Sequence, residues 1–164
     1  MAIHHIRTLG DPVLKEVAAP VDPANESLDE LVKNLADTMY NAPGLGLAAN
    51  QIGVLKQVFV FDVEDGLRAL ANPKILWQSE EIEEDEEGCL SLPEVRVAIA
   101  RPTRVKVEAT DMAGNVVAIE AEGLLARILQ HEIDHLNGRL LLDRASRAER
   151  KRAIREMNQL RLGG

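Results

Sequence analysis

One apolar segment of the chain carries three polar residues whose types and spacing could bind a metal. The segment reads LLARILQHEIDHLNG, and it places His131, Glu132 and His135 among aliphatic side chains. At about 100° per residue, both histidines fall on the helical stripe of Leu124 and Ile128, so they should face the core. Burial without partners costs about 2–7 kcal/mol for each neutral polar group and more for a charge. A divalent metal held by the two imidazoles, with the glutamate beside a water bound to it, would offset this cost.

The remaining residues of the same segment complete an amphipathic pattern. Glu132 falls beside two leucines, whereas Arg127, Gln130 and Asp134 occupy the polar arc opposite the histidines. The segment is therefore predicted to form an amphipathic helix, with the histidine stripe and the glutamate toward the core.

A hydrolytic metal site also needs a third protein ligand and one open position. No histidine follows His135, and the only later glutamates, Glu149 and Glu156, lie in a basic tail, so the third ligand is sought upstream. Cys89, the single cysteine, is the candidate, in the segment EGCLSLP. One cysteine excludes an intramolecular disulfide and fits a reducing compartment, which leaves a metal ligand, a nucleophile or an inert buried thiol. A thiolate with two imidazoles suits zinc, iron, cobalt and nickel alike.

Three segments of the chain resemble the signature motifs of the peptide deformylase family. Residues 44–51 read GLGLAANQ, residues 87–91 read EGCLS, and residues 130–138 read QHEIDHLNG. They occur in the order typical of that family and span much of the chain. The resemblance implies an enzyme that removes the N-formyl group from the initiator methionine of nascent polypeptides and releases formate.

The resemblance also implies the metal site of this enzyme. Its ligands would be Cys89, His131 and His135, with one divalent ion per chain. Fe(II) would be the physiological ion, and zinc, nickel or cobalt could occupy the site in preparations.

The same resemblance implies the catalytic residues. A metal-bound hydroxide would attack the formyl carbon, with Glu132 as general base and then as general acid. The side-chain amide of Gln51 and the backbone N–H of Leu90 would join the metal in stabilising the negative oxygen that forms.

Further positions resemble the substrate-binding residues of the family. The glycines of the first motif would let the substrate backbone approach closely, and apolar residues would form the methionine pocket together with the His131 ring. Arg127 departs from the usual apolar residue, and at the pocket rim it could narrow the pocket or favour acidic side chains. These substrate-binding positions are Gly44, Leu45, Gly46, Arg96, Leu124, Arg127 and Ile128.

The elements that must position these residues can be predicted from periodicity. Residues 1–26, with three prolines, should form an extended arm, and Ser27 and Glu30 form a capping box that starts a helix ending near Tyr40. A buried strand is expected at 57–61. Alternation on either side of Ala113-Gly114-Asn115 predicts a hairpin. We expect one α+β domain over residues 1–164, with antiparallel or mixed sheets around the metal-binding helix.

Charge is unevenly distributed along the chain. Residues 80–87 are acidic except for Ile82, which is typical of a solvated turn or strand edge. From Arg144 to the end the chain carries +5, leaving −13 for the rest, and a surface helix is expected at about 145–161 with Ile154, Met157 and Leu160 on its apolar stripe. That helix is either a solvated face or a docking face for an acidic or RNA-rich partner, and the resemblance to bacterial relatives implies the ribosome.

Composition excludes several classes of function. The net charge of −8 argues against binding to anionic membranes or phosphate backbones, and 2% aromatic residues leave few platforms for stacking bases. We therefore expect no specific DNA binding. Without a leader or an apolar run of about 18 residues, the chain should be soluble and cytoplasmic, with no membrane partner.

Two other interpretations remain open from the residues alone. A zinc endopeptidase could use the same histidine helix, but its third ligand would have to lie downstream. A catalytically weak paralogue could serve as a ribosome-binding or metal-holding module, and intact catalytic positions argue against it.

Overall fold

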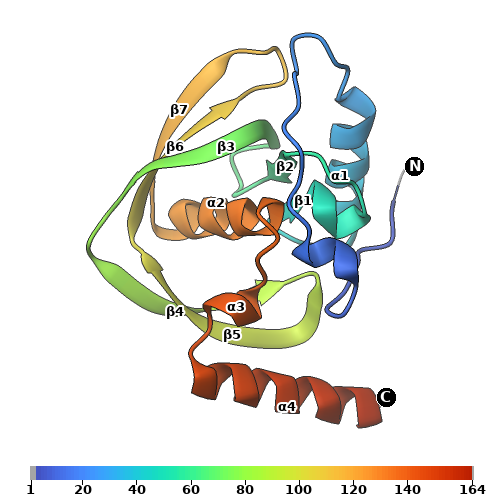
Figure 1. The fold of residues 1–164 in the computed structure, drawn as a ribbon, viewed down its shortest axis with the longest axis vertical. Helices are drawn as coiled ribbons and strands as arrows, with labels where there is room; N and C mark the ends of the chain where they lie inside the picture. Colours follow the sequence, from blue (N-terminus) through green and yellow to red (C-terminus); the bar gives the residue numbers. More distant parts are fainter. Residues whose placement is uncertain (1–2, 164) are drawn as a thin grey trace.

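Helix α2 (Gly123–Leu136) runs through the middle of the molecule between two β-sheets (Figure 1). The computed structural model describes residues 3–163. A five-stranded sheet in the order β1-β2-β3-β6-β7 curves around α2, and the two-stranded sheet β4-β5 lies on its other side. Every pairing between these strands is antiparallel within the described residues. The predicted α+β class, with antiparallel sheets around a central helix, is confirmed.

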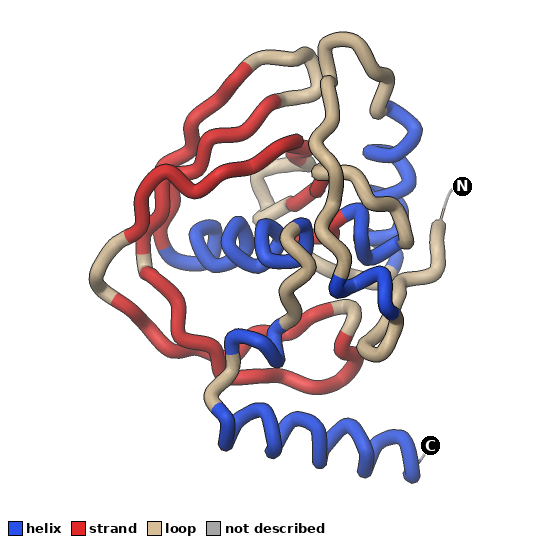
Figure 2. The backbone as a smooth tube through the Cα atoms, in the orientation of Figure 1, coloured by secondary structure: helices blue, strands red, loops and turns tan. Residues whose placement is uncertain are grey.

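The other elements follow one another along the chain and are coloured by type in Figure 2. They are η1 (Pro12–Lys15), α1 (Asp29–Asn41), β1 (Gly46–Ala48), η2 (Ala49–Ile52), β2 (Val58–Phe61), β3 (Arg68–Gln78), β4 (Ile82–Cys89), β5 (Leu92–Pro102), β6 (Arg104–Thr110), β7 (Val116–Glu122), α3 (Leu141–Arg144) and α4 (Arg147–Gly163).

The main core lies between α2 and the concave face of the five-stranded sheet. Phe59 and Phe61 of β2 stack with their ring centroids 5.7 Å apart, and Val107 of β6 packs in the same cluster. Leu129 and Ile133 of α2 fill the opposite side. Each such aliphatic side chain contributes about 1.5–3 kcal/mol on burial, so this cluster holds α2 against the sheet.

One buried strand and one hairpin were predicted correctly. The expected strand at 57–61 is β2, which is buried along its whole length. The expected hairpin is β6 and β7, in which Val107 pairs with Ile119 and Gly114 turns the chain at φ 90°.

Two long strands were not predicted, and each contains irregular residues, within β3 and at the start of β5. In β3, Asn72 has a left-handed φ of 50° and precedes Pro73, and the register with β6 shifts at this point. Strand β5 begins with Leu92 and Pro93, followed by Glu94 at φ 65°. Proline inside a strand is tolerated at such bulges and edges.

The predicted capping box at the start of α1 is wrong. The helix begins at Asp29 with Leu28 in the N-cap position, which makes no side-chain cap hydrogen bond, and Ser27 lies one residue earlier. The acidic residues Asp29 and Glu30 in the first turn favour the helix dipole instead. The helix ends at Asn41, one residue from the expected end.

The N-terminal arm crosses the molecule as predicted, apart from the short helix η1. Its backbone is bonded to the segments that carry the first and second motifs, among others. The Arg7 N–H donates to the Gln51 carbonyl at 2.7 Å, and the Leu9 N–H donates to the Ser91 carbonyl at 2.9 Å. The arm therefore ties two segments that are distant in sequence.

Helix α4 lies on the outside of the β4-β5 sheet (Figure 1), within two residues of the predicted bounds. Ala153 is fully buried and Met157 is half-buried against β5, whereas Ile154 and Leu160 are exposed. The predicted apolar stripe is therefore correct only at Met157. None of the helices in residues 3–163 combines the length and the apolar character needed to cross a membrane.

Gly138, which follows α2, is expected to be intolerant of a side chain. Its φ is +74°, and a Cβ would lie 2.6 Å from the Lys15 carbonyl oxygen. We expect Gly138→Ala to lower the free energy of unfolding by about 2–4 kcal/mol, measured by urea denaturation. Gly66→Ala is the matched control, because Gly66 has φ +96° but no atom near the added Cβ. It should cost only about 1 kcal/mol. Equal losses would contradict the steric explanation.

Candidate active site and metal centre

The sulfur of Cys89 and two imidazole nitrogens meet at one point. Cys89 ends β4, while His131 and His135 lie one turn apart on α2. The Cys89 Sγ lies 3.2 Å from His135 Nε2, and the Nε2 atoms of His131 and His135 are 3.1 Å apart. All three potential ligand atoms lie within 4.8 Å of one another. The chain therefore brings together the three residues that the sequence predicts as metal ligands.

The His131 ring is oriented by a buried carboxylate. Its Nδ1 lies 3.0 Å from Oε1 of Glu87, which is 5% exposed. A carboxylate at this distance favours the tautomer with the proton on Nδ1. When a metal displaces the second proton of the ring, the lone pair of Nε2 is directed toward Cys89 and His135, as a metal ligand requires.

A polar atom without a protein partner supports the fit of a metal. Among the described residues, Glu132 Oε1 is buried and makes no protein hydrogen bond, so it can accept one from a water bound to the metal. Glu132 lies against β1, because a Cβ on Gly46 would come 2.5 Å from its Oε2. One thiolate, two imidazoles and an adjacent free carboxylate oxygen match a divalent transition metal with an open coordination position.

The pKa values of these groups follow from their burial and their mutual charges. Burial raises the pKa of Cys89, but His135 and His131 outweigh it and hold that pKa well below its usual value. Burial likewise lowers the pKa of His131, yet Cys89 and Glu87 raise it well above the ordinary range. Burial raises the pKa of Glu132. The thiol is therefore poised as a thiolate, the form that binds metals.

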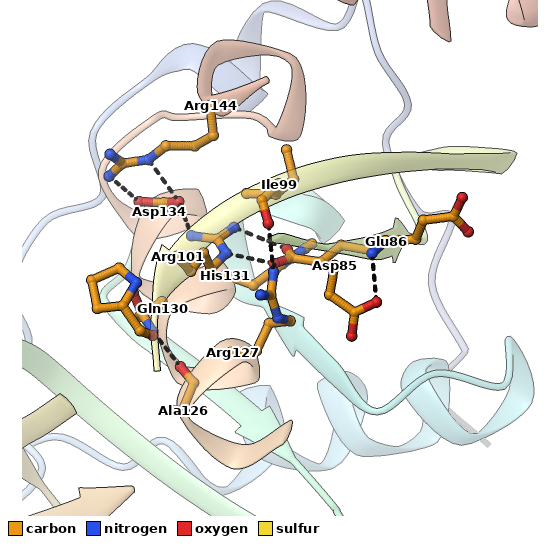
Figure 3. A network of polar contacts seen from close by, with 12 residues as sticks. Asp85, Glu86, Ile99, Arg101, Ala126, Arg127, Gln130, His131, Asp134 and Arg144 are labelled. Atoms are coloured by element: carbon orange, nitrogen blue, oxygen red, sulfur yellow. Dashed lines mark hydrogen bonds and ion pairs between the residues drawn. The ribbon is translucent and has the colours of Figure 1, made fainter. Parts of the chain in front are cut away.

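A network of ion pairs lies behind His131 (Figure 3). Arg101 of β5 binds both oxygens of Glu87, at 2.6 and 3.0 Å, and also reaches Asp134 of α2 at 2.9 Å. Arg144 of α3 holds the same Asp134 at 2.7 Å. Burial raises the pKa of Glu87, but hydrogen bonds from His131 and Arg101 lower it to about 2. The carboxylate is thus ionised whenever the protein is folded near neutral pH.

Three predictions about polar residues are wrong in this region. Glu87 is buried, unlike the exposed residues 83–86 that precede it, so the acidic segment is not solvated throughout. Gln130 and Asp134 are also buried, because strand β5 and the Arg101 side chain cover the arc of α2 opposite the histidines. The Arg127 guanidinium does not lie at a pocket rim but turns inward, 2.6 Å from Glu87 Oε2.

The amide of Gln51 is held in a defined orientation. Gln51 lies in η2 and is 2% exposed. Its Oε1 accepts from the Ala48 N–H at 3.0 Å, and its Nε2 donates to Ser91 Oγ at 3.0 Å. The same Nε2 lies 3.7 Å from Cys89 Sγ, so the amide N–H group faces the metal ligands.

The residues of the first and second motifs line the approach to this point. Leu90 follows Cys89 in the turn between β4 and β5, and a Cβ on Gly44 would come 2.7 Å from its Cδ1. Gly46 lies against Glu132 in the same way. The lack of a side chain at both glycines lets β1 and the residues before it lie close to the site. Leu45 is 47% exposed beside them.

The other expected substrate-binding residues are spread more widely. Leu124 is 57% exposed at the start of α2, whereas Ile128 is buried in the core between α2 and the sheet. Arg96 is exposed on β5, where it donates to the Glu86 carbonyl at 2.9 Å. These side chains do not converge on one point as the metal ligands do.

Three residues of the site received no role from the sequence. Glu87 was counted only in the acidic segment, although it orients His131. Ser91 lies inside the second motif, and its buried hydroxyl orients Gln51. Arg101 lies in the unpredicted strand β5. Its alternation with Val97 and Ile99, both buried, was a signal that this arginine faces inward.

The fold and the site define a class, that of metal-dependent hydrolases with a histidine-bearing helix at the centre of an α+β domain. The model of the polypeptide deformylase family matches residues 3–151. The peptide deformylase of Carboxydothermus hydrogenoformans is 48% identical over 92% of this chain and 99% of its own length. The chain belongs to the peptide deformylase family, whose members are metal-dependent hydrolases that remove N-formyl groups.

Solved structures agree with this assignment. The Thermotoga maritima peptide deformylase superposes with a TM-score of 0.85 at 46% identity, covering 89% of this chain and 99% of that one. The Synechococcus elongatus enzyme, solved in complex with actinonin, gives a TM-score of 0.91 at 38% identity, covering 96% of this chain and 89% of that one.

Glu87 is expected to support metal binding through His131. Glu87→Gln keeps the size of the side chain but removes the charge that holds the His131 proton. We expect metal affinity to fall about 10- to 100-fold, measured by competition with a chromophoric chelator. Glu84→Gln makes the same chemical change at an exposed position of β4 and should leave the affinity unchanged. Equal affinities for both variants would contradict the orienting role.

Proposed function

We propose that the chain removes the N-formyl group from the N-terminal formylmethionine of nascent polypeptides and releases formate. The single observation that carries this proposal is the convergence of the Cys89 sulfur with the Nε2 atoms of His131 and His135. When bound there, a divalent metal supplies Lewis acidity that makes a water molecule more acidic and polarises a carbonyl.

Glu132 moves the protons of the reaction. It is 4% exposed, its Oε1 has no protein partner, and burial raises its pKa toward the range useful for proton transfer. Glu132 takes a proton from the attacking water and then delivers it to the departing amine. Its position against Gly46 keeps it beside the strand where the substrate backbone would lie.

Gln51 and Leu90 stabilise the oxygen of the tetrahedral intermediate. The Gln51 amide is fixed by Ala48 and Ser91, so its N–H groups need no reorganisation as charge develops. The backbone N–H of Leu90 is the second donor, in the turn directly after Cys89.

The substrate chain lies along β1, and its methionine side chain packs on apolar groups near the metal. Gly44 and Gly46 leave room for the peptide backbone, and the exposed leucines at 45 and 124 provide apolar surface. Ile128 and the His131 ring complete the wall of this pocket. Arg96, which is free of buried contacts, binds the peptide backbone farther along.

Fe(II) is the ion that we propose for the cell, on the basis of the family. A thiolate and two imidazoles bind zinc, nickel or cobalt as well, so preparations can hold these ions instead. An Fe(II) site beside a thiolate is sensitive to oxygen, since the sulfur without its ion can be oxidised.

Formate release from formyl-Met-Ala tests the activity and its residues together. Wild-type protein loaded anaerobically with Fe(II) should release formate. Gln51→Ala should lower kcat about 10²- to 10³-fold with its fold intact, since one oxyanion donor is lost. Glu132→Ala should retain the metal and lose turnover, and Gln78→Ala, at an exposed position of β3, is the control.

The alternatives make different predictions in the same assay. Cleavage of an unformylated internal peptide without formate release would support a zinc endopeptidase and contradict the proposal. Binding to ribosomes without any deformylation would support the weak paralogue. Inhibition by actinonin, which the Synechococcus elongatus enzyme binds, would add support for the deformylase.

Helix α4 is proposed as the surface that binds ribosomes in the cytoplasm. The side of the helix with Ala153 and Met157 faces the body. Arg150 and Arg152 also donate to carbonyls of the body, whereas Lys151 and Arg155 are exposed. Reversing charge with Lys151→Glu and Arg155→Glu should reduce cosedimentation with ribosomes several-fold, because contacts to RNA phosphates depend on positive charge. The pair Lys33→Glu and Lys74→Glu, exposed on α1 and β3, is the charge-matched control. If both pairs weaken cosedimentation equally, α4 has no specific role.

A further inference from the structure

Arg127 joins helix α2 to both strands of the β4-β5 sheet. Its Nη1 donates to Glu87 Oε2 at 2.6 Å and to the Ile99 carbonyl of β5 at 3.0 Å. Its Nη2 donates to the Glu83 carbonyl of β4 at 2.9 Å. The side chain is 14% exposed, and Figure 3 shows it pointing toward Ile99 beneath the strand. The positive charge of Arg127 therefore serves contacts within the protein and does not face a substrate pocket.

The contact of Arg127 with Glu87 completes the set of hydrogen bonds that the carboxylate accepts. Oε1 accepts from His131 and Arg101, and Oε2 accepts from Arg101 and Arg127. An ionised carboxylate has about four lone-pair positions, and all of them are used. Glu87 cannot rotate without breaking a charged hydrogen bond, so the His131 ring that it holds cannot rotate freely either.

The metal ligands come from the two elements that Arg127 connects. His131 lies one helical turn after Arg127 on α2, and Cys89 lies two residues after Glu87 on β4. Arg101 belongs to β5 and reaches α2 only through Asp134. Arg127, in contrast, belongs to α2 and contacts β4 and β5 directly, near the metal ligands.

We propose that Arg127 is a positioning residue that fixes the sulfur-bearing strand β4 against the histidine-bearing helix α2. Its guanidinium sets the separation of the Cys89 sulfur from the imidazoles and thereby the geometry and retention of the metal. The effect on turnover rests on the proposed deformylase function, whereas the effect on metal binding does not.

Three acceptors around one side chain explain why this position favours arginine. A planar guanidinium presents several N–H groups in a fixed fork, so it can serve a carboxylate and two carbonyls together. A lysine keeps the charge but is a single point donor on a flexible chain. It should restore the ion pair to Glu87 and leave at least one carbonyl unpaired.

The test uses cobalt(II) as a spectroscopic probe in full-length wild type, Arg127→Met and Arg127→Lys. Arg127→Met should lose cobalt to a chelator about 10- to 100-fold faster and shift its visible absorption bands, which report ligand geometry. The cobalt release rate and band positions of Arg127→Lys should lie between those of wild type and Arg127→Met. Lys74→Met, which removes an exposed positive charge on β3, should match wild type. If Arg127→Met fails to fold by circular dichroism, Arg127→Lys carries the same comparison.

Formate release then separates positioning from substrate binding. For the iron enzyme we expect Arg127→Met to lower kcat with KM for formyl-Met-Ala nearly unchanged. A rise in KM with wild-type cobalt spectra and release rates would overturn the proposal and favour a substrate-contacting arginine. Wild-type cobalt behaviour together with wild-type kinetics would overturn it as well. Absence of formate release by the wild type would contradict the proposed function alone, since the cobalt measurements still decide the role of Arg127.

Discussion

The buried carboxylate of Glu87 is the interaction on which the site depends. Two arginines neutralise it, and its remaining contact orients His131 toward Cys89. A buried charge with only one of these partners would be costly, because removing a partner from a buried pair costs about 3–5 kcal/mol. Satisfied on all sides, the carboxylate joins α2 to the β4-β5 sheet and keeps the metal-binding atoms together. Without it, the two elements would be joined by the contact of Arg101 with Asp134 and by the bonds of Arg127 to backbone carbonyls, neither of which touches a metal ligand.

The chemistry of the centre could be predicted because its pattern is local. His131 and His135 are one helical turn apart in sequence, and this spacing alone brings their nitrogens together. Cys89 followed from the absence of any other suitable ligand and from its motif. Strand β2 was predictable from its continuous run of β-branched and aromatic residues, and the hairpin of β6 and β7 from its alternation of apolar and polar residues.

The surroundings of the metal ligands could not be predicted from local pattern. Glu87 belongs to a run of acidic residues, and only the pairing of β4 with β5 under α2 decides which of them is buried. Arg127 and Asp134 were assigned to an open arc because a helical wheel assumes one buried face. Helix α2 is covered on both sides, so its polar arc faces Arg101 and Glu87. Polar residues of a central helix can therefore be buried on either face.

The N-terminal arm adds a constraint of timing. Its backbone amides at Arg7 and Leu9 are bonded to carbonyls of Gln51 and Ser91, which leave the ribosome much later. The first segment to be synthesised therefore lacks its Ser91 partner until more than half of the 164 residues have been made. The same residue supports the side-chain amide of Gln51, so that support is also missing until Ser91 has been synthesised.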